Sequence, residues 1–130
     1  MKAPVPVLRI FDEAKAKEFY VGFLGFVVDW EHRFGDGFPL YLQVSRGNCV
    51  LHLSAHHGDA CPGASLRIET PGLGDYIAGL RSKGYMYAKP GEPEAMPWGC
   101  REICITDPFG CRVIFWESTN ETLAHEAERG

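Results

Sequence analysis

One pattern of residues occurs twice in this chain, and this repetition constrains the fold more than any other feature. In each half an apolar strand is followed by an amphipathic helix that stops at a glycine, over 13–24 before Gly25 and over 73–83 before Gly84. Self-similarity at a spacing of about 60 residues indicates an internal duplication, although two amphipathic helices can also resemble each other by chance. The chain is therefore predicted to be an α+β protein made of two similar halves.

Apolar runs and turn residues place strands around the two helices. In the first half, strands are predicted over 5–10, 26–33, 38–44 and 49–54, with hairpin turns at 35–37 and 45–48. In the second half, strands are predicted over 64–69, 85–88, 100–106 and 111–117, with an exposed loop over 89–97 and a type I turn over 107–110. Asp12 is the predicted N-cap of the first helix. Each half is thus predicted to be a βαβββ module.

The length of 130 residues favours a single domain. Its predicted parts are module one over about 4–55, module two over about 62–117 and a polar C-terminal tail over 118–130. The net charge is −4 and the pI is about 5.7, with no basic cluster, which argues against a nucleic-acid partner. A neutral or cationic small molecule is the better electrostatic match.

Apolar runs and cysteines in the sequence predict where in the cell the protein is located. The first eleven residues carry two prolines and no apolar run of signal-peptide length, and no run of 18 apolar residues would cross a membrane. The five cysteines form no Cys-x-x-Cys pair, which is typical of reduced structural thiols rather than a zinc site. A cytoplasmic protein without a membrane association is therefore expected. There is no nucleophile elbow, phosphate-binding loop or dinucleotide fingerprint.

Three short motifs in this order are similar to those of the glyoxalase/bleomycin-resistance/extradiol-dioxygenase superfamily, also called the vicinal oxygen chelate superfamily. They are Val7-Leu8-Arg9-Ile10 followed by Asp12, Phe19-Tyr20 followed by Leu24-Gly25-Phe26, and Asp107-Pro108-x-Gly110 before the last apolar strand. The resemblance covers residues 4 to 117. It implies that the two modules form a curved mixed sheet.

Metal-dependent enzymes of this superfamily hold a divalent ion with histidines and a glutamate from four strands. Matching the flanking residues places those positions at Val5, at His52, at Gly63 or Ala64, and at Ile114. Of these side chains, His52 alone is a metal ligand, and one ligand does not hold such an ion. At these positions the chain departs from the enzymes that it resembles. We therefore expect no metal, no cofactor and no catalytic residue.

The bleomycin-resistance branch is more similar still, through Pro97-Trp98-Gly99-x-Arg101-Glu102 and through Leu51-His52-Leu53 with His56. Proteins of that branch are small acidic homodimers that sequester a glycopeptide drug without altering it. The resemblance implies that Trp98 stacks on the flat part of such a drug, opposite Phe38.

The ligand-binding residues predicted on these grounds are Trp98, Phe38, His52, Gly99 and Glu102. By strand alternation His52 faces away from Leu51 and Leu53, and Glu102 faces away from Arg101. Structural roles are the alternatives: Trp98 capping the core, His52 as a satisfied structural histidine, and Glu102 in a surface salt bridge. Trp116 is expected in the core.

The sequence thus favours a non-catalytic homodimer that binds a bleomycin-type antibiotic and confers resistance. Two other functions stay open at this point. One is a metal-dependent lyase, isomerase or dioxygenase in which His52 takes part, and the other is the binding of a different metabolite.

Overall fold

The computed structural model describes residues 1–119 of the chain. They divide into two compact units: the first holds Met1–Ser65 with Thr106–Arg112, and the second holds Leu66–Ile105 with the described residues from Val113 to Thr119. Two βαβββ modules are present, so the predicted α+β fold is confirmed, with one four-stranded sheet in each module. That the modules make a single domain stays a prediction. The predicted tail lies outside the described residues from residue 120 on.

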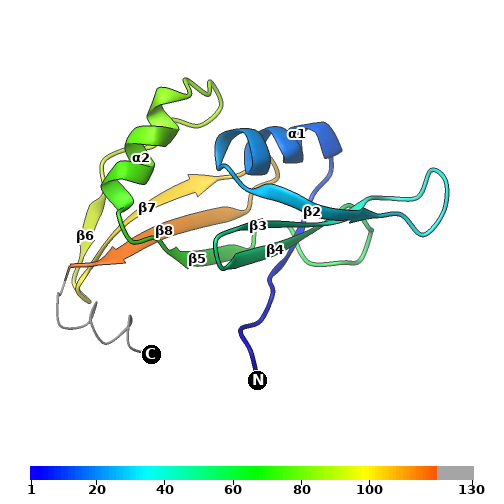
Figure 1. Cartoon of the computed structure of the whole chain (residues 1–130), viewed down its shortest axis with the longest axis horizontal. Coiled ribbons are helices and arrows are strands. Elements are labelled where there is room, and N and C mark those ends of the chain that lie inside the picture. The colour runs from blue at the N-terminus through cyan, green and yellow to red at the C-terminus, as the bar shows by residue number, and fades with distance from the viewer. Residues whose placement is uncertain (120–130) are drawn as a thin grey trace. The chain divides into compact units, whose positions relative to one another are not determined.

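The sheet of the first unit has the spatial order β1-β4-β3-β2 (Figure 1). Its strands are β1 (Val7–Arg9), β2 (Val27–His32), β3 (Tyr41–Arg46) and β4 (Cys49–Ser54). Strand β1 runs parallel to β4, whereas β2, β3 and β4 form an antiparallel meander. Arg46 pairs with Cys49 across a two-residue turn, in which Gly47 has a φ of +57°. The hairpin predicted over 45–48 is therefore confirmed.

Alternation along β3 and β4 separates the core from an accessible face. Leu42, Val44, Leu51 and Leu53 are almost completely buried, whereas the side chain of His52 is only part-buried and lies on the opposite face. The predicted orientation of His52 is therefore correct, and the polar side chains of this accessible face can contact a ligand.

The first helix begins where the sequence predicts. Helix α1 spans Glu13–Lys17, and Oδ1 of Asp12 accepts a hydrogen bond of 2.8 Å from the backbone N–H of Lys15. Asp12 is therefore the N-cap, which satisfies one of the backbone donors that a helix start leaves unpaired.

The second part of this helix departs from the prediction of one regular helix over 13–24. It continues as a π-helix, η1 (Glu18–Phe23), and the N–H of Leu24 donates to the carbonyl of Phe19, five residues earlier, over 2.8 Å. The wider turn allows adjacent aromatic residues to enter the core together. The buried aromatic side chains of η1 are Phe19, Tyr20 and Phe23.

The turn over 107–110 belongs to the first unit and is fastened to η1. The N–H of Gly110 donates to the carbonyl of Asp107 over 3.3 Å, which closes a β-turn where the sequence predicts one. The hydroxyl of Tyr20 donates to Oδ2 of Asp107 over 2.6 Å, and Oδ1 accepts from the N–H groups of Phe109 and Cys111 over 2.9 and 2.8 Å. Burial, and then the charge of Asp107, raise the pKa of Tyr20 well above its usual range, so the phenol stays a donor.

The sheet of the second unit has the spatial order β5-β8-β7-β6 (Figure 1). Its strands are β5 (Ser65–Glu69), β6 (Glu94–Met96), β7 (Cys100–Thr106) and β8 (Arg112–Ser118). Helix α2 (Leu73–Ser82) confirms the second predicted helix, and Gly84 follows it with a φ of +62°. Its N-cap, Gly72, has no side chain, so the N–H of Leu73 donates instead to Oε2 of Glu117, over 3.2 Å. Within residues 1–119, no helix is long and apolar enough to cross a membrane.

The sixth strand is not where the sequence predicts it. The strand expected over 85–88 is wrong: Met86 and Tyr87 lie in a turn, and Tyr87 is largely exposed. Strand β6 lies instead inside the segment expected to be a loop, over 89–97, where Glu94 and Met96 pair with Glu102 and Cys100 of β7. Tyrosines favour strands only where a neighbouring strand accepts them, and here pairing with β7 decides the location.

Candidate functional site

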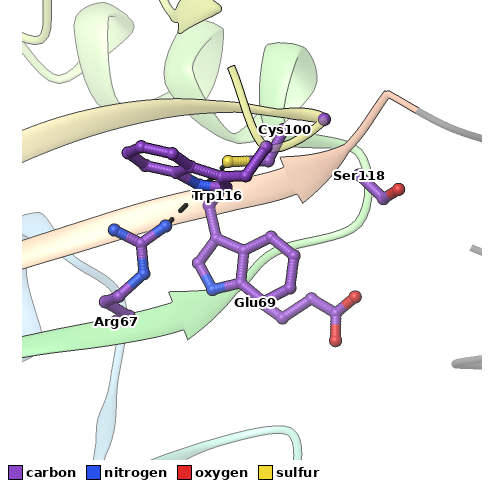
Figure 2. Close-up of a pocket in the computed structure, with 7 residues that line it drawn as sticks. Arg67, Glu69, Cys100, Trp116 and Ser118 are labelled. Carbon is purple, nitrogen blue, oxygen red and sulfur yellow. Dashed lines mark hydrogen bonds between the residues drawn. The ribbon is translucent and has the colours of Figure 1, made fainter. Parts of the chain in front are cut away.

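The second sheet has one face in the core and one accessible face. On β8, Val113 and Phe115 are buried, whereas Ile114 and Trp116 between them are only part-buried. A pocket of about 370 Å³ lies on the accessible face (Figure 2). Among the residues that line it are Arg67, Glu69, Trp98, Gly99, Cys100 and Trp116.

Trp98 lies in the tight turn between β6 and β7. The N–H of Gly99 donates to the carbonyl of Met96 over 3.2 Å, so residues 96–99 form a β-turn with Trp98 at its third position. Gly99 has a φ of +85°, where a side chain would be strained. The indole of Trp98 is 63% exposed, which leaves a large flat surface at the edge of the pocket for a ligand.

Arg67 organises the floor of this pocket. It extends from β5 and forms an ion pair of 2.7 Å with Glu102, which is only 8% exposed. The same guanidinium donates to Sγ of Cys100 over 3.9 Å, as Figure 2 shows, and lies 5.9 Å from the ring centre of Trp116. The charge of Arg67 is thus paired with that of Glu102, and Glu69 is the exposed carboxylate among the residues that line the pocket.

The first unit contains a second pocket, of about 430 Å³. Its lining residues are Trp30, His32, Phe34, Tyr41, His56 and Asp59. The rings of Trp30 and Tyr41 stack at 6.0 Å with an interplanar angle of 12°, and Phe34 meets His56 edge-on at 5.4 Å. Aromatic faces and one carboxylate therefore surround this space. We call it the aromatic pocket.

A chain of hydrogen bonds connects Asp29, Gln43 and His52 to Tyr41, which lines the aromatic pocket. The carboxylate of Asp29 accepts from Nε2 of Gln43 over 3.0 Å, and Oε1 of Gln43 lies 3.0 Å from Nε2 of His52. The other ring nitrogen of His52, Nδ1, lies 2.7 Å from the hydroxyl of Tyr41. A carboxylate offers only acceptors, so the Gln43 amide must turn its NH₂ to Asp29 and its oxygen to His52. In neutral His52 the hydrogen is then on Nε2, and Nδ1 accepts the hydroxyl hydrogen of Tyr41.

A family model described as "Glyoxalase superfamily protein" matches residues 1–122. The chain belongs to the glyoxalase superfamily. Comparison with curated proteins gave no significant match. The match in the family model confirms the family that the sequence motifs indicated.

Solved structures of other proteins share the fold. A bleomycin-binding protein in complex with bleomycin has a TM-score of 0.71 at 22% identity, with 91% of this chain and 99% of that chain covered. A bleomycin resistance determinant encoded on the transposon Tn5 has a TM-score of 0.71 at 20% identity, covering 92% and 100%. TnmS3, an antibiotic binding protein from Streptomyces sp. CB03234, has a TM-score of 0.67 at 23% identity, covering 90% and 97%.

The metal centre of the superfamily's enzymes does not fit the residues of this member. Both ring nitrogens of His52 are already hydrogen-bonded, to Tyr41 and Gln43. The β1 residue paired with His52 is Val7, so a shift of two residues from Val5 still gives an apolar side chain. Among residues 1–119, no group of three or more histidine, cysteine, aspartate or glutamate side chains is arranged to hold a metal ion.

The predicted site residues fall into both units. Trp98 and Gly99 line the pocket of the second unit, and Glu102 reaches it through its ion pair with Arg67. His52 lies in the first unit, next to the aromatic pocket.

Phe38 lies in the loop between β2 and β3 of the first unit. Its side chain is 53% exposed and packs against Gly35, and its carbonyl accepts a hydrogen bond of 2.9 Å from Arg33. It is not among the residues that line either pocket.

Sequence reasoning missed several lining residues that alternation could have found. Trp116 was expected in the core, but it is only part-buried and lines the pocket of the second unit. Its neighbour Phe115 is the buried residue, as the alternation of β8 requires. The same alternation on β5 directs Arg67 and Glu69 to the accessible face.

Proposed function

We propose that this protein binds a flat, cationic glycopeptide antibiotic of the bleomycin type and sequesters it without altering it, thereby conferring resistance. The observation that carries the proposal is the pocket of the second unit, in which the exposed indole of Trp98 stands beside Trp116 and the carboxylate of Glu69. Structural neighbours that bind bleomycin or another antibiotic support the choice of ligand class.

In the proposed complex, Trp98 stacks on the flat ring system of the drug and Glu69 attracts its positive charge. An aromatic stack contributes about 0.5–1.5 kcal/mol beyond the burial of area. Glu102 acts by holding the guanidinium of Arg67 in the floor of the pocket, since the two are ion-paired at 2.7 Å. Phe38 and His52 lie in the first unit and do not line the pocket around Trp98, so their contact with the drug is proposed on the sequence resemblance alone.

The proposal includes a homodimer with two drug-binding grooves between subunits, as in the bleomycin-resistance branch that the sequence resembles. Light scattering of the purified protein tests it, and a mass of one chain at the concentration used for drug titration would contradict it. The proposed location is the cytoplasm, which suits five cysteines that form no disulfide.

The decisive experiment is a calorimetric titration of the purified protein with copper-free bleomycin. We expect sub-micromolar binding, near one drug per chain, and at least about tenfold weaker binding by Trp98→Ala, which equals about 1.4 kcal/mol. The melting temperature of Trp98→Ala should stay nearly unchanged because the indole is exposed. Tyr87→Ala is the matched control: this aromatic side chain is 73% exposed in the same unit and does not line the pocket. Absence of heat from the wild type, or equal binding by Trp98→Ala, would overturn the proposal.

A further inference from the structure

The aromatic pocket of the first unit presents hydrogen-bond acceptors to its interior. The order of donors in the Asp29–Gln43–His52 chain commits the hydroxyl hydrogen of Tyr41 to Nδ1 of neutral His52, over 2.7 Å. A phenol has one hydrogen and two acceptor lone pairs. Tyr41 lines the pocket, and its oxygen therefore keeps acceptor lone pairs but no hydrogen for a ligand.

Asp59 adds a negative charge to the same space. Its Oδ2 accepts a hydrogen bond of 2.8 Å from the hydroxyl of Ser54, and its backbone N–H donates to the carbonyl of His56 over 3.2 Å. Both bonds hold the carboxylate in place, and among residues 1–119 no donor occupies its second oxygen. Burial, and then the charge of Asp59, raise the pKa of Tyr41, which keeps the phenol protonated toward His52.

His56 contributes a polar atom that the folded chain leaves unsatisfied. Its ring lines the pocket, and its Nε2 is buried with no hydrogen-bond partner among the described residues. Buried polar atoms of this kind are rare and destabilising unless a ligand or water pairs with them. His56 therefore brings an unsatisfied polar atom to the wall of the pocket.

The remaining walls are aromatic. Trp30 stacks on Tyr41, and Phe34 meets both His32 and His56 edge-on, at 4.5 and 5.4 Å. The faces of such rings attract cations within about 6 Å of their centres. A volume of about 430 Å³ matches a small organic molecule rather than a bare ion.

We infer that the aromatic pocket binds a protonated organic amine. The ammonium N–H groups donate to the oxygen of Tyr41 and to the carboxylate of Asp59, and the organic part packs on Trp30 and Phe34. This ligand matches the acceptors, the charge and the apolar walls together, whereas an anion or a neutral alcohol would not. The inference rests on other residues than the drug-binding proposal, since the aromatic pocket shares no lining residue with the pocket that Trp98 lines.

The test is a titration of the full chain with phenethylammonium chloride, followed by ¹H–¹⁵N NMR. We expect the largest shifts at Trp30 and His56, and at least tenfold weaker binding of 2-phenylethanol, which has the same ring without the charge. Asp59→Asn and Tyr41→Phe should each weaken amine binding at least fivefold. Equal binding of the amine and the alcohol, or unchanged affinity in Asp59→Asn, would overturn the inference.

Matched variants separate local recognition from general charge or folding effects. Asp36→Asn removes the same charge from an exposed turn of the same unit, and Tyr87→Phe removes an exposed phenol; both should bind the amine as the wild type does. Asn at position 59 keeps an oxygen for the Ser54 hydroxyl, so that variant should melt as the wild type does. If copper-free bleomycin competes with the amine, the aromatic pocket binds an amine group of the drug. If the two bind independently, the pocket binds a different small molecule.

Discussion

The hydrogen bond between Tyr20 and Asp107 gives the sharpest test of how the first unit holds the turn over 107–110. Both residues are buried, at 0% and 4% exposure, and the Tyr20 hydroxyl is the donor to Oδ2 of Asp107 over 2.6 Å. Tyr20→Phe keeps the ring in the core and removes only the oxygen. It therefore leaves one carboxylate oxygen buried without its donor, while the N–H groups of Phe109 and Cys111 still serve the other.

A hydrogen bond to a charged group is worth about 1.5–3 kcal/mol, and a buried acceptor without a donor costs a comparable amount. We expect Tyr20→Phe to lower the free energy of unfolding by about 2 kcal/mol at pH 7. Urea unfolding followed by circular dichroism measures this change, with Tyr87→Phe, an exposed phenol, as the control. A loss below about 0.5 kcal/mol in Tyr20→Phe would refute the argument, since surface changes usually stay within that limit.

The same hydrogen bond predicts that the wild type and Tyr20→Phe differ in how their stability depends on pH in the alkaline range. Burial and Asp107 raise the pKa of Tyr20 in the folded protein, so the folded state holds this proton more tightly than the unfolded state. The stabilisation is fully present below the unfolded tyrosine pKa of about 10 and is lost as pH rises above it, at about 1.4 kcal/mol per pH unit. The wild type should therefore lose stability above pH 10 more steeply than Tyr20→Phe. Equal slopes would show that this tyrosine is not the group responsible.

Two further contacts make measurable predictions. Asp12→Ala removes the N-cap of α1 and should cost about 1 kcal/mol in urea unfolding, whereas Asp36→Ala in an exposed turn should cost almost nothing. Partial burial would raise the pKa of Glu117, but hydrogen bonds from Arg101 and from the N–H of Leu73 lower it below its usual 4.5. This stabilisation is present above pH 4.5 and is lost as pH falls below it, so Glu117→Gln should flatten the acid limb of stability; an unchanged limb would contradict the assignment.

Much of the fold could be predicted because its determinants are local. Asp12 and the helix-ending glycines mark helix boundaries within a few residues, and the turn over 45–48 fixes a two-residue hairpin. Strands β4 and β7 have the predicted bounds, 49–54 and 100–106. The errors have non-local causes. The π-helix depends on burying neighbouring aromatics, and β6 depends on pairing with β7.

The candidate site was predictable where alternation or a turn decides the geometry. The sequence placed Trp98 in a Pro-Trp-Gly context, and the structure shows its indole exposed at a β-turn. It also predicted that Arg101 and Glu102 face opposite sides of β7, and the structure pairs them separately, with Glu117 and with Arg67. No local pattern indicated that Arg67 would hold Glu102, because the partners lie 35 residues apart.

The aromatic pocket could not be predicted because it depends on an irregularity of one residue. In regular β2, Asp29 and Trp30 would point to opposite faces of the sheet. The pairing with β3 shifts between Val28 and Trp30, so β2 has a bulge at Asp29. Both residues therefore act on the same face, where Asp29 orients Gln43 and Trp30 meets His52 edge-on at 5.3 Å. The bulge therefore places on one face both the hydrogen-bond chain that begins at Asp29 and the aromatic wall that includes Trp30. Strict alternation along β2 would have put these two residues on opposite faces.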